Sequence, residues 1–131
     1  MQNLKKNLIT IITVVKNSAP TIEKCIKSVL DQNYGKIEYI IIDGNSNDGT
    51  EKVIQKYKNK ISKILIEKDN GIWDAMNKGI GVAQGEIIGF LNADDFYNPG
   101  ALEIVNKYFN THPIDFLFGT VKKYKVIHGY K

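Results

Sequence analysis

The sequence predicts an α/β fold, with a mainly parallel sheet and helices on both faces. Strand-like and helix-like segments alternate along the chain in the order βαβαβαβαβ. The strand-like segments are short β-branched runs, which are typical of strands buried on both faces of a parallel sheet. No linker or repeat interrupts the 131 residues, so we expect a single domain over residues 1–131.

Short runs rich in Ile and Val are the expected strands, because these side chains suit a pleated and buried surface. The runs cover residues 8–15, 37–42, 61–66 and 87–91, and residues 115–128 are expected to add one or two further strands. The first run is too short for a membrane-spanning helix, and no cleavage site follows it, which argues against a signal peptide.

Apolar residues spaced three and four apart predict four helices between the strands. The stripes are Ile22, Cys25, Ile26, Val29 and Leu30; Val53, Ile54 and Tyr57; Ile72, Met76, Ile80 and Ala83; and Leu102, Val105 and Phe109. We expect Ser18, Asp48 and Asn70 to cap the first three helices, because their side chains accept hydrogen bonds from free N–H groups. Asn98-Pro99 is expected to open the fourth.

Composition and charge exclude several other classes of protein. Hydrophobic residues make up 43% of the chain and charged residues 24%, which is typical of a globular domain. Cys25 is the only cysteine, which excludes an internal disulfide and a cysteine-based zinc site, and its place in a helical stripe predicts burial. The net charge of +4 is mild, so we expect no nucleic-acid partner, and we expect a cytoplasmic location.

Polar residues gather in the loops after the first four strands. These loops cover residues 16–20, 43–49, 67–70 and 92–95. In open α/β sheets, ligands bind beyond the carboxyl ends of the strands. The sequence therefore predicts a binding site made by these loops.

Two carboxylates end the fourth strand, in the sequence Asn92-Ala-Asp-Asp95. Adjacent carboxylates at the end of an apolar strand repel each other unless a cation or hydrogen-bond donors lie beside them. Such oxygen ligands suit Mg²⁺ or Mn²⁺, which commonly take one or two carboxylates together with substrate phosphates. The dipeptide alone leaves an equal alternative, in which one Asp caps the next helix and the other is solvated.

Other polar side chains at the strand ends are candidates for contacting a nucleotide. Asp43 can accept a hydrogen bond from a base N–H or a ribose hydroxyl, and Thr13 and Asn17 can hydrogen-bond a base. Taken alone, Asp43 is better interpreted as part of an Asx turn, and Thr13 as an ordinary strand residue. No phosphate loop, correctly placed dinucleotide fingerprint or nucleophile elbow is present, and His112 and His128 lie in the C-terminal tail.

Three sequence blocks, taken in order, resemble the family 2 glycosyltransferases, enzymes with the GT-A nucleotide-sugar-binding fold. Residues 12–50, which end in IIIDGNSNDGT, resemble the opening block of the family. EKDNGIWDAMNKG at 67–79 resembles its middle block, and GEIIGFLNADD at 85–95 resembles the strand that carries its DxD metal motif. One such block is weak evidence, whereas three at compatible spacing make a strong resemblance.

The resemblance implies roles for particular residues. Those expected to hold the nucleotide and the sugar are Thr13, Val15, Asn17, Asp43, Asn77, Lys78 and Asn92, with Asp43 facing a pyrimidine ring. Asp94, together with Asp95, is expected to bind a divalent metal, Mn²⁺ or Mg²⁺. Asn92 stands where the family often has the first DxD aspartate, which removes one charge, and Met76 replaces an Arg that is common in other members.

The resemblance also implies a reaction: metal-assisted transfer of a sugar, with inversion, from a UDP-sugar to a saccharide or lipid-linked acceptor. Family members of this kind often build cell-surface polysaccharides of bacteria at the inner face of a membrane, so peripheral membrane contact is compatible with it. In the family, the general base and most of the acceptor site follow the segment that resembles residues 115–128. We therefore assign no catalytic base.

Residues 1–131 are thus expected to be the donor half of a glycosyltransferase, with the acceptor half largely absent. A truncated piece of a longer enzyme is favoured, because the last segment ends within predicted sheet structure. A short relative that binds the donor without catalysis, a nucleotide-sugar-binding module, stays open. A sugar-nucleotide pyrophosphorylase is a weaker alternative, because residues 16–20 lack the required Gly-rich loop with Arg and Lys.

Overall fold

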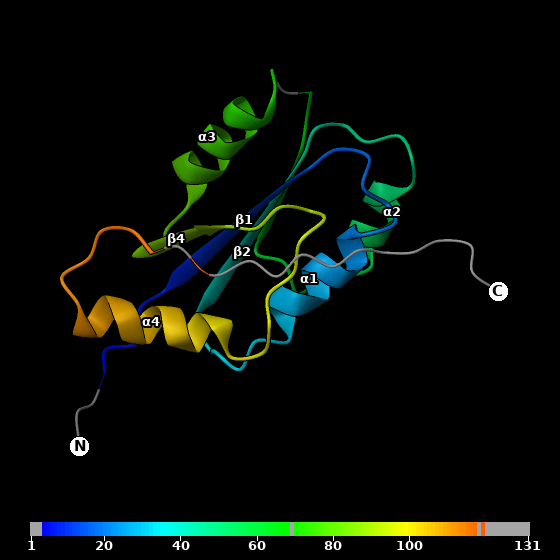
Figure 1. The fold of residues 1–131 in the computed structure, drawn as a ribbon. Coiled ribbons are helices and arrows are strands. Elements are labelled where there is room, and N and C mark those ends of the chain that lie inside the picture. The colour runs from blue at the N-terminus through cyan, green and yellow to red at the C-terminus, as the bar shows by residue number, and fades with distance from the viewer. Residues whose placement is uncertain (1–3, 69, 118, 120–131) are drawn as a thin grey trace.

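The computed structural model describes residues 4–68, 70–117 and 119. Within them, strands and helices alternate along the chain (Figure 1). In chain order they are β1 (Ile9–Val15), α1 (Ile22–Leu30), β2 (Ile37–Asp43), α2 (Thr50–Gln55), β3 (Lys63–Ile66), α3 (Ile72–Val82), β4 (Ile87–Phe90) and α4 (Ala101–Thr111). None of the helices in this part of the chain is long and apolar enough to cross a bilayer.

The described strands form one parallel sheet in the order β3-β2-β1-β4. β1 pairs with both of its neighbours: its Val15 is level with Asp43 of β2, and its Ile12 is level with Phe90 of β4. Helices connect successive strands and cover both faces of the sheet (Figure 1). The predicted α/β class, with a mainly parallel sheet, is confirmed.

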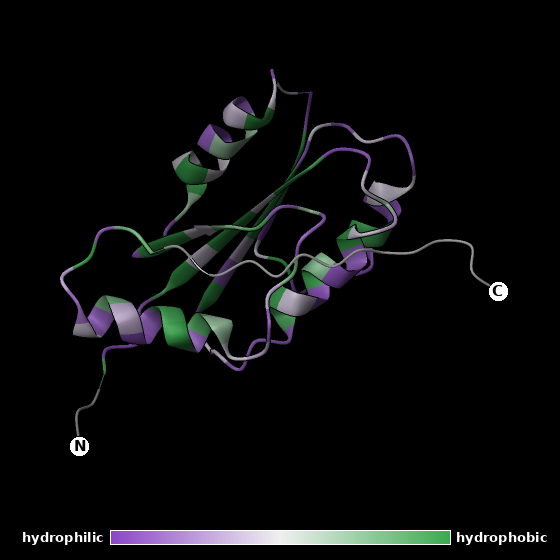
Figure 2. Ribbon diagram, in the orientation of Figure 1, coloured by the Kyte–Doolittle hydropathy of each residue, from purple (hydrophilic) through white to green (hydrophobic). Residues whose placement is uncertain are grey.

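Alternate side chains of β1 and β2 build two hydrophobic clusters, one on each face of the sheet. Figure 2 shows the strands as mostly apolar along their length. On one face, Ile11 and Ile41 pack with apolar residues of α1, α2 and α4, and Cys25 is buried among them, as predicted. On the other face, Ile12 and Ile40 pack against α3.

Some predicted boundaries are shifted in the structure. β3 begins at Lys63, not at residue 61, because the Ser62 side-chain oxygen accepts the Tyr39 N–H (2.9 Å) just before the strand. α2 ends at Gln55, so Tyr57 lies beyond the helix in which it was predicted. Residues 115–117 and 119 are not in a strand, and the rest of the predicted 115–128 strand region, with His128, lies outside the described residues.

The predicted side-chain caps are wrong for the first three helices. The residues at the N-cap positions of α1 to α4 are Thr21, Gly49, Gly71 and Gly100, and none of them makes a side-chain cap hydrogen bond. Asp48 comes nearest to its predicted role, because its Oδ1 accepts the N–H of Thr50, the first residue of α2 (3.0 Å). Before α1, the N–H groups of Thr21 and Ile22 donate instead to the Ser18 backbone carbonyl (3.1 and 2.9 Å).

α3 packs on the sheet with a different face from the predicted one. Ile72 and Ile80, which were expected to be buried with Met76 and Ala83, are 48% and 45% exposed. The buried residues of the helix are Ala75 and Gly79. A Cβ atom on Gly79 would lie 2.7 Å from Cγ2 of Ile12, so the helix approaches the sheet through its smallest residues.

A polar cluster holds the turn between α3 and β4. Glu38 Oε1 accepts hydrogen bonds from the Thr10 hydroxyl (2.7 Å) and the Gln84 N–H (2.8 Å), and Oε2 lies 3.6 Å from Lys63 Nζ. The Thr10 oxygen in turn accepts the Gly85 N–H (2.9 Å). Burial alone would raise the pKa of Glu38, but these hydrogen bonds and the Lys63 charge outweigh it and hold the pKa below its usual value.

Glu38→Gln is therefore expected to flatten the acid side of the stability profile. A carboxylate whose pKa is lowered by folding stabilises the protein above its unfolded pKa, and this stabilisation is lost as the pH falls through the folded pKa. At pH 7 we expect the unfolding free energy of the variant to be about 1–2 kcal/mol below that of wild type. Between pH 7 and pH 3 we expect the variant to lose less unfolding free energy than wild type does. Urea unfolding across this range measures both, with exposed Glu51→Gln as control. Parallel profiles for wild type and Glu38→Gln would contradict the assignment.

Candidate functional site at the carboxyl edge of the sheet

The loops after β1, β2 and β4 meet at one edge of the sheet. Asp43 is level with Val15, and the Leu91 N–H continues the β1–β4 ladder by donating to the Ile12 carbonyl (3.0 Å). The next residue, Asn92, therefore lies near the level of the end of β1. Because neighbouring strands are about 4.8 Å apart, the ends of β2 and β4 are separated by roughly 10 Å across β1. Asp43 and the 92–95 loop thus share one edge, as the sequence predicts.

Asp43 is a buried carboxylate with one unsatisfied oxygen. The residue is fully buried, and its Oδ1 accepts hydrogen bonds from the N–H (3.0 Å) and the hydroxyl (2.6 Å) of Ser46. Oδ2 is also buried and has no hydrogen-bond partner among the described residues. Leaving a buried acceptor unsatisfied costs about 1–3 kcal/mol, and more when it is charged. Oδ2 therefore favours a hydrogen-bond donor supplied by a ligand.

Hydrogen bonds join the loop after β1 to the loop after β2, and we call residues 16–19 and 44–50 together the loop platform. Three bonds run from the first loop to the second: the Asn17 N–H donates to Ser46 Oγ (2.8 Å), the Ser18 N–H to Thr50 Oγ1 (2.9 Å) and the Ala19 N–H to Asp48 Oδ2 (3.1 Å). A fourth bond runs the other way, from the Asn47 N–H to Asn17 Oδ1 (2.9 Å). Ser46 also donates to Asp43, so the platform holds the carboxylate. Asn17 has a left-handed φ of 51°, and its side-chain oxygen is used within the platform.

Ser46 was missed by the sequence reasoning, although it is the residue that links Asp43 to Asn17. The signal that could have found it is its position three residues after Asp43. Asp side chains commonly hydrogen-bond polar groups two or three residues further along a turn.

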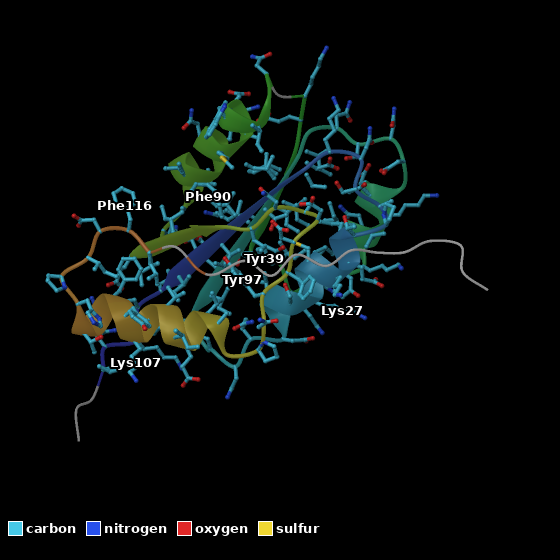
Figure 3. The ribbon with its side chains drawn as sticks, viewed as in Figure 1. Lys27, Tyr39, Phe90, Tyr97, Lys107 and Phe116 are labelled. Carbon is cyan, nitrogen blue, oxygen red and sulfur yellow. The ribbon has the colours of Figure 1, made fainter. Side chains whose placement is uncertain are left out.

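Thr13 and Val15 belong to the core, with 0% and 2% of their surface exposed. The Thr13 hydroxyl lies 2.9 Å from that of Tyr39 (labelled in Figure 3) and 3.7 Å from Cys25 Sγ, which donates to the Asn92 carbonyl (3.4 Å). Burial raises the pKa of both Cys25 and Tyr39, so both remain protonated at neutral pH. Thr13 thus contacts Cys25, which in turn bonds the 92–95 loop, and the nucleotide contacts of Thr13 and Val15 stay predictions.

Lys78 is held by two carboxylates beside the segment that precedes α3. Its Nζ lies 3.0 Å from Glu67 Oε1 and 3.2 Å from Asp74 Oδ2, and these hydrogen bonds raise the pKa of Lys78. Asp74 also accepts the Asn70 N–H (3.1 Å). A phosphate would have to compete with both carboxylates for Lys78, whereas the neighbouring Asn77 is exposed. In the structure Lys78 joins α3 to the loop after β3, and its contact with a nucleotide stays a prediction.

Asn92, Asp94 and Asp95 are exposed in the loop after β4, where the Asp95 N–H donates to the Asn92 carbonyl (3.0 Å). The alternative that Asp94 or Asp95 caps the next helix is wrong, because α4 has Gly100 at its N-cap. Within the described residues, no hydrogen bond or ion pair engages either carboxylate.

These two carboxylates fit a divalent cation that is completed by a ligand. The described part of the chain contains no group of three His, Cys, Asp or Glu residues that could hold a metal by itself. Mg²⁺ and similar ions, however, are commonly bound by one or two carboxylates with substrate phosphates filling the remaining positions. The donor set therefore suits a cation that binds together with a diphosphate.

Comparisons with known proteins show the family of this chain. The family model described as Glycosyl transferase family 2 matches residues 10–128. A Bacillus subtilis (strain 168) protein named as a candidate teichuronic acid biosynthesis glycosyltransferase, TuaG, is 37% identical over 101 residues, or 75% of this chain and 40% of that protein. A PGL/p-HBAD biosynthesis glycosyltransferase of Mycobacterium bovis (strain BCG / Pasteur 1173P2) is 32% identical over 119 residues, or 87% of this chain and 46% of that protein. The chain thus spans less than half the length of these relatives.

Solved structures share the fold. S. aureus TarS 1-349 in complex with UDP-GlcNAc matches with a TM-score of 0.74 at 24% identity, covering 79% of this chain and 31% of that one. The mannosyltransferase PcManGT from Pyrobaculum calidifontis, in complex with GDP-Man and Mn²⁺, matches with a TM-score of 0.73 at 24% identity, covering 83% and 34%. The GT-A-like fold is confirmed. Because the family model covers nearly the whole sequence, the chain belongs to glycosyl transferase family 2.

Proposed function

We propose that this chain is the donor-binding part of a glycosyltransferase and that a UDP-sugar lies across the carboxyl edge of its sheet. The observation that carries the proposal is Oδ2 of Asp43, buried and without a hydrogen-bond partner among the described residues, on one side of β1, with exposed Asp94 and Asp95 on the other. A nucleoside diphosphate complements both, because its base can offer an N–H donor and its phosphates can share a cation. The curated relatives are named glycosyltransferases, which supports the same activity.

The chemistry of Asp43 predicts which bases bind. Uracil has an N3–H that can donate to Oδ2, and guanine has an N1–H, whereas cytosine has no ring N–H in that position. The two solved relatives hold UDP-GlcNAc and GDP-Man, whose bases both carry such a donor. Because Oδ2 is enclosed, binding requires a local shift in the loop platform, where Asn45 and Asn47 are exposed.

Asp94 and Asp95 would hold the divalent cation, Mn²⁺ or Mg²⁺. When bound, this ion supplies positive charge against the negative charge that grows on a departing diphosphate. Asn92 offers an amide in the same loop without adding charge, and exposed Asn77 is the proposed contact on the sugar side. Inversion at the anomeric carbon, a saccharide or lipid-linked acceptor and peripheral membrane contact are predictions for the whole protein.

Titration calorimetry of the chain with UDP, GDP and CDP, each with Mn²⁺ and with EDTA, tests the proposal. We expect UDP to bind more tightly than CDP, and Mn²⁺ to increase the affinity for UDP. An assay of UDP-sugar hydrolysis then separates binding from turnover, since binding alone would favour the nucleotide-sugar-binding module. Equal, cation-independent binding of UDP and CDP would contradict the proposal.

Asp43→Asn is expected to weaken UDP binding about tenfold, or ~1.4 kcal/mol, both with Mn²⁺ and with EDTA. The amide presents an N–H₂ group where the carboxylate has an acceptor, so the base donor loses its partner. The unfolding free energy is expected to stay the same or to rise, because a buried charge is removed. Asp31→Asn, an exposed change at the C-terminal end of α1, is the control. A loss seen only with Mn²⁺ would show that Asp43 acts on the cation side instead.

A further inference from the structure

One face of α1 holds the segment that follows β4. Cys25 and Ser28 are three residues apart in α1, so their side chains lie along the same side of the helix, and Gln32 follows two residues after its last residue, Leu30. Cys25 Sγ donates to the Asn92 carbonyl (3.4 Å), and Ser28 Oγ accepts the Tyr97 N–H (3.1 Å). α1 thus contacts the backbone of this segment on both sides of the two exposed carboxylates.

Gln32 extends this contact to the start of α4. The residue is 8% exposed, its Oε1 accepts the Leu102 N–H (3.1 Å), and its Nε2 donates to the carbonyls of Asn98 (2.9 Å) and Ser28 (3.0 Å). Gly100, at the N-cap of α4, has no side chain to accept a hydrogen bond from the helix. Gln32, just after the end of α1, therefore supplies the acceptor that a capping residue normally supplies from its own helix.

Side-chain packing reinforces the same attachment. Lys24 Nζ lies 4.0 Å from the centre of the Phe96 ring, and Tyr97 is partly buried against the cluster that contains Tyr39 (Figure 3). Asp94 and Asp95 lie between the attached residues and stay exposed. The segment is therefore held at its ends while its carboxylates face outward.

We propose that Ser28 and Gln32 are positioning residues that hold the Asp94 and Asp95 carboxylates ready for a cation and a diphosphate. This inference rests on the proposed function. Ordering one residue of a free loop costs about 1–2 kcal/mol, and a ligand that must order the loop loses that amount from its affinity. Ser28 in α1 and Gln32 just after it order the loop in advance, without touching the ligand.

Ser28→Ala tests the inference, because it removes one acceptor and leaves α1 a good helix. We expect faster amide hydrogen exchange over residues 93–98 and a loss of about tenfold in UDP affinity with Mn²⁺, as for other supports of metal ligands. In EDTA, the affinity for UDP is expected to change less than about twofold, because the Asp43 side of the site is untouched. Ser28→Thr, which keeps the hydroxyl, is expected to restore both measurements.

Ser62→Ala is the matched control, since the Ser62 oxygen also accepts a backbone N–H (2.9 Å, from Tyr39) but lies at the amino end of β3. An equal loss of Mn²⁺-dependent affinity in both alanine variants, or unchanged exchange in Ser28→Ala, would overturn the inference. A wild-type chain that binds no UDP would instead contradict the proposed function. In that case hydrogen exchange still decides whether α1 holds the loop.

Discussion

Asp94→Ala is expected to lower the affinity for UDP in Mn²⁺ by about 100-fold, or ~2.7 kcal/mol, while affinity in EDTA stays near that of wild type. Asp94 is one of two exposed carboxylates in the loop after β4, and neither is engaged by another described side chain. Removing it leaves a single carboxylate, Asp95, to hold the cation beside the diphosphate. Calorimetric titration of wild type and variant with UDP, once in Mn²⁺ and once in EDTA, measures the two affinities.

Asp115→Ala is the control for this experiment, because Asp115 is also exposed but lies beyond α4. We expect it to leave UDP binding unchanged in both conditions. The melting temperature of Asp94→Ala is expected to match that of wild type, since the carboxylate supports no other described group. If Asp94→Ala bound UDP as tightly as wild type in Mn²⁺, Asp94 would not be a ligand of the cation.

Gly85→Ala is expected to be the most destabilising single change considered, at about 3 kcal/mol, which lowers the melting temperature by roughly 10 °C. A Cβ on Gly85 would lie 2.7 Å from the backbone nitrogen of Thr10 and 2.9 Å from the carbonyl oxygen of Ile87, and it would also collide with the Thr10 hydroxyl. Backbone atoms of paired strands cannot move aside without disturbing the pairing of β1 with β4. Thermal unfolding followed by circular dichroism measures the loss.

Gly81→Ala is the matched control, because a Cβ there would meet nothing within 4 Å on an exposed part of α3. In a helix interior, alanine is favoured over glycine by about 1 kcal/mol, so this variant is expected to be slightly more stable than wild type. Equal melting temperatures of the two variants would show that a Cβ atom at position 85 causes no destabilising clash with β1 and β4.

The sequence predicts most of the fold, because burial of large apolar residues leaves a periodic pattern. The stripe of α1 is one example: Ile22, Cys25, Ile26 and Val29 are all buried. α3 shows why the pattern fails elsewhere. Where a helix lies close to a sheet, the contact is made by the smallest residues, here Ala75 and Gly79, and a search for large apolar side chains selects a neighbouring, partly exposed face.

The gathering of Asp43, Asp94 and Asp95 at one edge could also be predicted, because parallel strands bring their carboxyl ends together there. What could not be predicted is which polar groups the protein itself uses. Asn17 and Lys78 are engaged by Asn47 and Glu67 in other loops. The partners of Gln32 lie 66 and 70 residues further along the chain, a separation at which local patterns carry no information.

The loop platform has a consequence for engineering of donor preference. Backbone N–H groups of residues 17–19 depend on oxygens of Ser46, Asp48 and Thr50, and Asn47 depends on Asn17. A graft that exchanged either loop alone between family members would leave several of these groups mismatched. Chimaeras should therefore transplant both loops together, so that every backbone N–H keeps the side-chain oxygen that accepts its hydrogen bond.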